Sequence, residues 1–139
     1  MQGTRIVALL ACVAAALLSG CSTSSGQQFQ PEVSDPKKGL LYVFRESGGL
    51  MQSGVEISIN QQVAGELHPG QYLVKSLPPD EYFVRAAAKS NMVRAVKLVE
   101  GDVVYLRVTT QSFGRKPHLD FPESDVARHM IANTTKLAE

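Results

Sequence analysis

The feature that most limits the fold of this chain is a series of short strand-like runs between Gly39 and Gln111, separated by turn residues. The clearest run, Val55 to Ile59, alternates strictly between apolar and polar side chains, as expected for a half-buried strand. Turn residues recur about every ten residues, a spacing typical of sandwiches and small barrels. We therefore predict a mainly β fold, an antiparallel β-sandwich of about seven strands spanning residues 39–122.

A single helix is expected after the strands. Pro122 suits a first helical turn, and acidic side chains near a helix start are favoured by the helix dipole. Val126, Ala127, Met130 and Ile131 recur at helical spacing and form one apolar stripe. We predict a helix from about Glu123 to Asn133 that packs across the sandwich or covers an open sheet end, within a C-terminal unit of residues 123–139.

The first 20 residues have the form of a secretory signal peptide. Arg5 precedes an apolar run from Ile6 to Leu18, which is too short to span a bilayer because a spanning helix needs about 20 apolar residues. Small residues then precede a cysteine. A plain secretory signal with an incidental cysteine is the alternative.

The four residues Leu18, Ser19, Gly20 and Cys21 resemble the lipobox of bacterial lipoproteins. The resemblance implies lipid attachment at Cys21 and cleavage between Gly20 and Cys21. It also implies that Ser22, which stands where Asp would retain the protein at the inner membrane, favours the outer membrane, periplasmic side. Two or more acyl chains hold a protein firmly, whereas a single chain binds membranes only marginally.

The expected mature chain is nearly neutral, with 13 Lys and Arg against 13 Asp and Glu once Arg5 is removed. No basic stripe indicates a nucleic-acid surface. Cys12 leaves with the signal peptide and Cys21 carries lipid, so a disulfide is not expected. Residues 21–38 are rich in Ser, Gln, Gly and Pro, and we expect a flexible tether. The alternative is that Phe29 and Val33 dock as an added edge strand.

Strand and turn sequences between Gly39 and Val108 resemble a family of small bacterial lipoproteins catalogued as a domain of unknown function. They also resemble prealbumin-like and PEGA-type β-sandwich modules, in which a turn similar to Leu77-Pro78-Pro79-Asp80-Glu81-Tyr82 joins two strands. Asp80 departs from the usual Gly, although Asp tolerates the left-handed conformation better than most residues. The resemblance implies a fold and transfers no catalytic residue.

Residues with catalytic or metal-binding chemistry are scattered. His68, His118 and His129 lack the close spacing of a zinc site, and His118 with Asp120 is a weak metal pair. No Gly-x-Ser-x-Gly elbow or phosphate-cradling glycine loop is present. We expect no catalytic residues, metal or cofactor.

Two surface features remain as contact candidates. Leu50 and Met51, in a glycine-flanked loop, either fold back on the sandwich or touch a partner or the bilayer. A second set could meet anionic headgroups or form an ordinary charged surface; it comprises Arg85, Lys89, Arg94, Lys97 and Arg107. The function expected is a non-catalytic, lipid-anchored envelope module that binds another envelope protein. Alternatives are a carrier of a small ligand or lipid, and an envelope hydrolase.

The lipid assignment predicts that Cys21→Ala yields a product without acyl mass, because the thiol that receives the lipid is gone. Intact mass spectrometry of the membrane and soluble fractions measures this change. Cys12→Ala is the matched control and should leave the mature mass unchanged. Retention of the acyl mass in Cys21→Ala would contradict the assignment.

Overall fold

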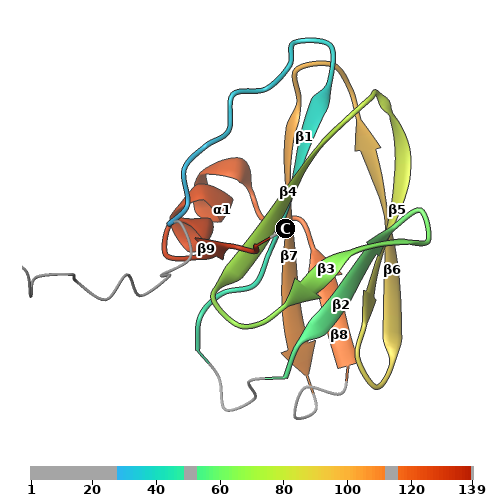
Figure 1. Cartoon of the computed structure of the whole chain (residues 1–139), viewed down its shortest axis with the longest axis vertical. Coiled ribbons are helices and arrows are strands. Elements are labelled where there is room, and N and C mark those ends of the chain that lie inside the picture. Colours follow the sequence, from blue (N-terminus) through green and yellow to red (C-terminus); the bar gives the residue numbers. More distant parts are fainter. Residues whose placement is uncertain (1–27, 49–52, 112–115, 139) are drawn as a thin grey trace, which may run out of the picture.

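The computed structural model describes residues 28–48, 53–111 and 116–138, and this part of the chain holds nine strands and one helix (Figure 1). The strands are β1 (Gly39–Phe44), β2 (Val55–Ile59), β3 (Gln62–Leu67), β4 (Gln71–Leu77), β5 (Asp80–Ala87), β6 (Asn91–Leu98), β7 (Val103–Gln111), β8 (Lys116–Asp120) and β9 (Thr135–Lys136). The helix is α1 (Ser124–Ile131).

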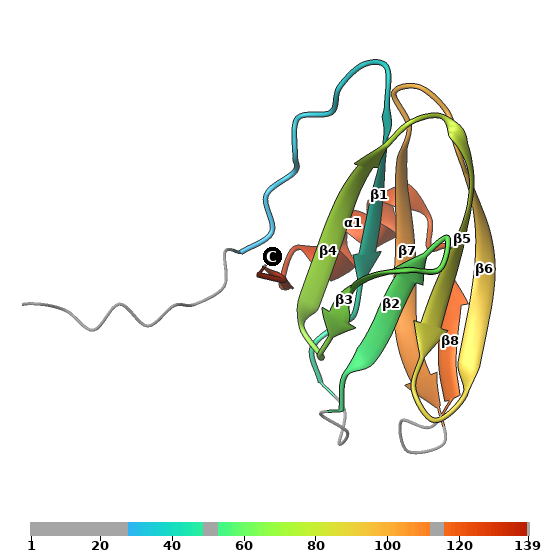
Figure 2. The ribbon, with the colours of Figure 1, turned by 45° about the vertical axis from the view of Figure 1, so that its right-hand side comes forward.

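The strands form two sheets that face each other as a sandwich (Figure 2). The first sheet has the order β8-β7-β1-β4-β9, and the second has the order β3-β2-β5-β6. Side chains from both sheets fill the interior, including Leu41 and Val43 of β1, Ile57 of β2, Val84 of β5 and Leu106 of β7. The predicted fold class, mainly β with a sandwich and one C-terminal helix, is confirmed.

The structure corrects two details of that prediction. Nine strands are described where about seven were expected, because β8 pairs with β7 at one edge of the first sheet and β9 pairs with β4 at the other. Pro117 is compatible with β8 because β8 lies at the sheet edge, where a missing N–H breaks no ladder. The pairing is also not purely antiparallel, since β1 pairs with β7, and β4 with β9, in parallel.

Strand β1 is buried on both faces. Leu41 and Val43 point into the sandwich interior, whereas Leu40, Tyr42 and Phe44 belong to a second apolar cluster on the outer face of the first sheet. A run of six consecutive apolar or glycine residues suits such a strand.

Helix α1 covers this outer face, as Figure 1 shows. Ala127 and Ile131 are fully buried against the cluster. Val126, which was predicted to share their stripe, is exposed instead. The helix is also shorter than predicted, since it ends at Ile131, and the next turn is closed by the Thr134 hydroxyl donating to the Ile131 carbonyl at 2.6 Å.

Residues 28–38 run along the outer face of the first sheet. They were expected to be a flexible tether, but the first of them make defined contacts with this face. The Phe29 ring makes edge contacts with Tyr42 and Tyr72, at centroid distances of 5.6 and 5.3 Å. The Phe29 N–H donates to the Thr134 carbonyl, and Gln28 forms a single bridge with Thr135. Val33 is fully exposed. Of the two residues in the edge-strand alternative, only Phe29 docks.

Further contacts fasten this segment. The Glu32 N–H donates to the Tyr42 hydroxyl at 2.8 Å, and the Glu32 carboxylate pairs with Lys136 at 2.6 Å. Burial raises the pKa of both Tyr42 and Tyr72. We refer to residues 28–32 as the N-terminal strap, because they join the first sheet to the C-terminal strand β9.

Replacement of Phe29 by Ala should destabilise the domain by about 1–3 kcal/mol, less than the loss for a fully buried Phe because the ring is only partly covered. The reason is the loss of two aromatic contacts under the strap. Urea unfolding measures the effect. Phe83→Ala, at a half-exposed position on β5, is the matched control and should change the free energy of unfolding by less than about 0.5 kcal/mol. Equal effects of the two changes would contradict docking of the strap.

Candidate functional site

The lipobox residues Leu18, Ser19, Gly20 and Cys21, and the contact candidates Leu50 and Met51, lie outside the described residues. A membrane-spanning helix is not found among the residues that are described.

The three histidines are not brought together into a site. His68 pairs with Glu66 at 3.3 Å, His118 lies on the edge strand β8, and His129 is exposed on α1. Asp120, the weak partner predicted for His118, is bonded through both oxygens to the Arg107 guanidinium, at 3.1 and 2.8 Å. Across residues 28–48, 53–111 and 116–138, no group of three His, Cys, Asp or Glu side chains could hold a metal.

The structure also disperses the five basic residues considered as a lipid-binding set. Arg85 and Lys97 lie on the outer face of the second sheet, whereas Arg107 lies on the first sheet. The hydrogen bond to Asp120 is the largest of the effects that raise the pKa of Arg107. Arg94 stacks over the Phe121 ring, 5.7 Å from its centroid.

Arg45 is the most buried charged side chain described, with 5% of its surface exposed. Its guanidinium donates to the Ser53 carbonyl at 2.6 Å, the Leu67 carbonyl at 3.1 Å and the Thr110 hydroxyl at 3.4 Å. Burial lowers its pKa. These bonds link Arg45, just after β1, to the segment before β2 and to the ends of β3 and β7, so the role of Arg45 is structural.

The two outer faces of the sandwich differ in their cover. The first sheet is covered by α1 and the N-terminal strap, whereas the views in Figures 1 and 2 place no other described element over the second sheet. Phe83 and Val93 project from this uncovered face and are 53% and 54% exposed. Arg85 lies on the same face. It pairs directly across the strands with Val93 and stands two residues after Phe83 along β5.

A hollow of about 480 Å³ lies on this uncovered face. It is lined by Ser58, Asn60, Gln61, Glu81, Phe83, Arg85 and Val93. Asn60 and Gln61 form the two-residue turn between β2 and β3, and both have positive φ, at 47° and 69°, as the primed hairpin turns require. The Asn60 side chain accepts a hydrogen bond from the Phe83 N–H at 2.9 Å, which fixes the turn against β5.

These lining residues combine an aromatic ring, an aliphatic side chain, amides and one charge of each sign. No His or Cys is among them, so the arrangement lacks the usual base and nucleophile pairs. Aromatic and Arg side chains are, by contrast, enriched at protein interfaces. Phe83 and Val93 were not predicted as contact residues from the sequence. The signal for Phe83 was an aromatic residue on the otherwise polar face of its strand.

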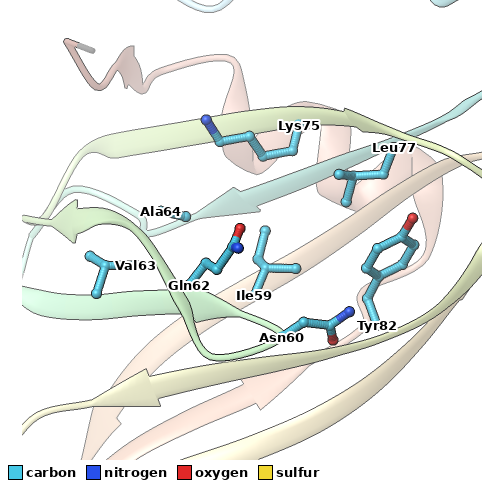
Figure 3. A pocket seen from close by; sticks show the side chains of 8 residues that line it. All are labelled: Ile59, Asn60, Gln62, Val63, Ala64, Lys75, Leu77 and Tyr82. Carbon is cyan, nitrogen blue, oxygen red and sulfur yellow. The ribbon is translucent and has the colours of Figure 1, made fainter.

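A second hollow, of about 310 Å³, lies between β3 and β4 at the side edge of the sandwich (Figure 3). It is lined by Ile59, Asn60, Gln62, Val63, Ala64, Lys75, Leu77 and Tyr82. The Tyr82 hydroxyl donates to the Pro78 carbonyl at 2.7 Å, so the phenol is already bonded.

Comparison with known proteins gives little further guidance. No protein-family model matches the chain, and no curated protein matches it significantly. The chain is similar to a solved structure of the N-terminal domain of AlgF from P. aeruginosa, with 22% identity over 62% of this chain and 96% of that one. The TM-score is 0.39.

Replacement of Arg45 by Lys should destabilise the domain by about 1–3 kcal/mol, because one ammonium cannot reach all three acceptors that the guanidinium bonds. Urea unfolding measures the change. The matched control is Arg85→Lys on the uncovered face, for which we expect less than about 0.5 kcal/mol. An unchanged free energy of unfolding for Arg45→Lys would show that these bonds do not stabilise the fold.

Proposed function

We propose that this chain is a lipid-anchored bacterial envelope lipoprotein, held on the periplasmic side of the outer membrane, and that it acts as a non-catalytic interaction module. Its uncovered sheet face binds another envelope protein. The observation that supports this most is the asymmetry of the sandwich, since one outer face is covered and the other presents Phe83 and Val93 to solvent.

The N-terminal strap relates the anchor to this asymmetry. Seven residue steps separate Cys21 from Gln28, which limits their separation to at most about 25 Å. Gln28 bridges Thr135 at the edge of the first sheet. A lipid on Cys21 therefore keeps the covered side near the membrane, and the uncovered face is available on the opposite side.

The composition of the uncovered face favours a protein partner over the bilayer. Glu81 and Arg85 give one charge of each sign around the hollow, whereas binding to anionic lipid calls for clustered Lys and Arg. Phe83 and Val93 supply the apolar centre that protein interfaces commonly have. The amides of Asn60 and Gln61 add hydrogen-bonding groups at its rim.

A carrier that holds its ligand inside the sandwich is less well supported. The side chains between the sheets are almost completely buried by one another, including Leu41, Ile57, Val84 and Leu106 at zero exposure. The two hollows described above both lie at the surface. A small-ligand carrier would therefore hold its ligand at the surface, and native mass spectrometry would detect the added mass.

The proposal predicts that p-benzoylphenylalanine at position 83 forms a crosslink to a discrete envelope protein in intact cells, because this residue lies at the centre of the proposed interface. Position 126 is the matched control, since Val126 is also exposed but lies on α1, over the opposite sheet. The combined change Phe83→Ser and Val93→Ser should abolish co-purification of the same partner from detergent-solubilised membranes, with little loss of stability.

Crosslinks of equal yield at positions 83 and 126 would contradict binding of the partner through the uncovered face. Retention of the partner by the double variant would do so as well. Cys21→Ala separates the anchor from the interface, because it should release the protein from the membrane and leave the face intact.

A further inference from the structure

The side edge of the sandwich between β3 and β4 is only partly closed. Strand β9 pairs with Gln71 and Tyr72 alone, and the Leu137 N–H adds one further bond to the Tyr72 carbonyl at 2.8 Å. The Leu137 side chain lies against Gly65 of β3, where even a Cβ would clash with it. The C-terminal segment thus fills one end of the gap, and the paired strands described leave Leu73–Leu77 without a neighbour on this side.

The 310 Å³ hollow occupies the remaining part of this gap (Figure 3). Its apolar surface comes from Ile59, Ala64 and Leu77, which pack against the interior cluster and remain partly exposed, together with the Tyr82 ring. The volume is at the lower end of the range for small-molecule sites, about 300–1,000 Å³. An apolar chain placed here would extend the interior packing.

Lys75 is a charged residue that stands between two apolar residues on one face of β4. It alternates along β4 with Leu73 and Leu77, both of which contact the interior cluster, so its stem follows the inner face of the strand. No ion pair to Lys75 is formed by the described acidic residues, although three other Lys and Arg side chains in this part of the chain have carboxylate partners. The Gln62 amide lies among the same lining groups.

We propose that this hollow binds an apolar monocarboxylate. Its chain packs on Ile59, Leu77 and Tyr82, and its carboxylate accepts charge-assisted hydrogen bonds from the Lys75 ammonium, which are stronger than neutral ones. The site shares Asn60 with the hollow on the uncovered face. Neither Lys75 nor the residues proposed to pack on the ligand belong to the surface proposed for protein binding, so each proposal can fail without the other. A free fatty acid and a polypeptide C-terminus with an apolar last residue share this chemistry.

A competing explanation is that Lys75 only protects an open edge. Inward-pointing charges on edge strands discourage pairing with another chain. That role requires no ligand and predicts self-association when the charge is removed, so the two explanations give different results in one experiment.

The experiment uses the full anchored chain in phosphatidylcholine nanodiscs, with octanoate and its neutral isostere octanamide as probes. Amide chemical shifts of Ala64 and Leu77 in ¹⁵N-labelled protein report occupancy. We expect octanoate to bind at least tenfold more tightly than octanamide. Lys75→Gln should remove this preference, whereas Lys97→Gln, on the outer face of β6, should keep it. Ala64→Leu should weaken both probes, because the larger side chain fills the hollow.

Three results would overturn the proposal. These are equal affinity for the two probes, an unchanged preference in Lys75→Gln, or no octanoate-dependent shifts at Ala64 and Leu77. Self-association of Lys75→Gln, with no octanoate binding by the native chain, would assign Lys75 to edge protection. An acetylated peptide ending in Leu, compared with its amidated form, identifies the source: tighter binding of the free-acid peptide than of octanoate indicates a polypeptide C-terminus, and the reverse order indicates a fatty acid.

Discussion

The burial of β1 on both faces is the constraint on which the rest of the structure depends. A strand with apolar side chains on both sides needs cover on both sides, and the second sheet can supply only one of them. Helix α1 and the N-terminal strap supply the other, through Ala127, Ile131 and Phe29. The N-terminal strap and α1, which lie far apart in the sequence, are therefore both used to cover one sheet, and among the described residues nothing covers the outer face of the second sheet.

The cover of the first sheet is also where the N-terminal strap meets the C-terminal strand β9. The strap bonds to Thr134, and its Glu32 carboxylate pairs with Lys136 of β9. Strand β9 in turn pairs with β4 in parallel. This arrangement connects the segment that leads to Cys21 with the strand bordering the side-edge hollow. The N-terminal strap and α1 thus lie on one side of the molecule, while the proposed interface occupies the opposite face.

Much of the fold follows from local sequence pattern. The strand from Val55 to Ile59 was predictable because alternation repeats with the two-residue period of a strand, and Pro122 with the acidic residues after it marked the start of α1. The parallel pairing of β1 with β7 could not be predicted in this way, because it joins segments about 60 residues apart and has no local signal. The partner of Asp120 could not be predicted either. Asp120 forms an ion pair with Arg107 across the β7–β8 pair, whereas the sequence suggested only the nearby His118.

The sequence by itself determined that the chain forms short strands with one C-terminal helix, since period, turn residues and helix-start residues act over a few positions. It also carried the resemblance to a lipobox, which involves only contiguous residues. Only the tertiary structure decided that Phe29 packs on Tyr42 and Tyr72, that Phe83 and Val93 stay uncovered, and that Lys75 borders an open edge. Each of these depends on which sheet face receives a cover, and that choice is made by contacts between residues distant in the chain.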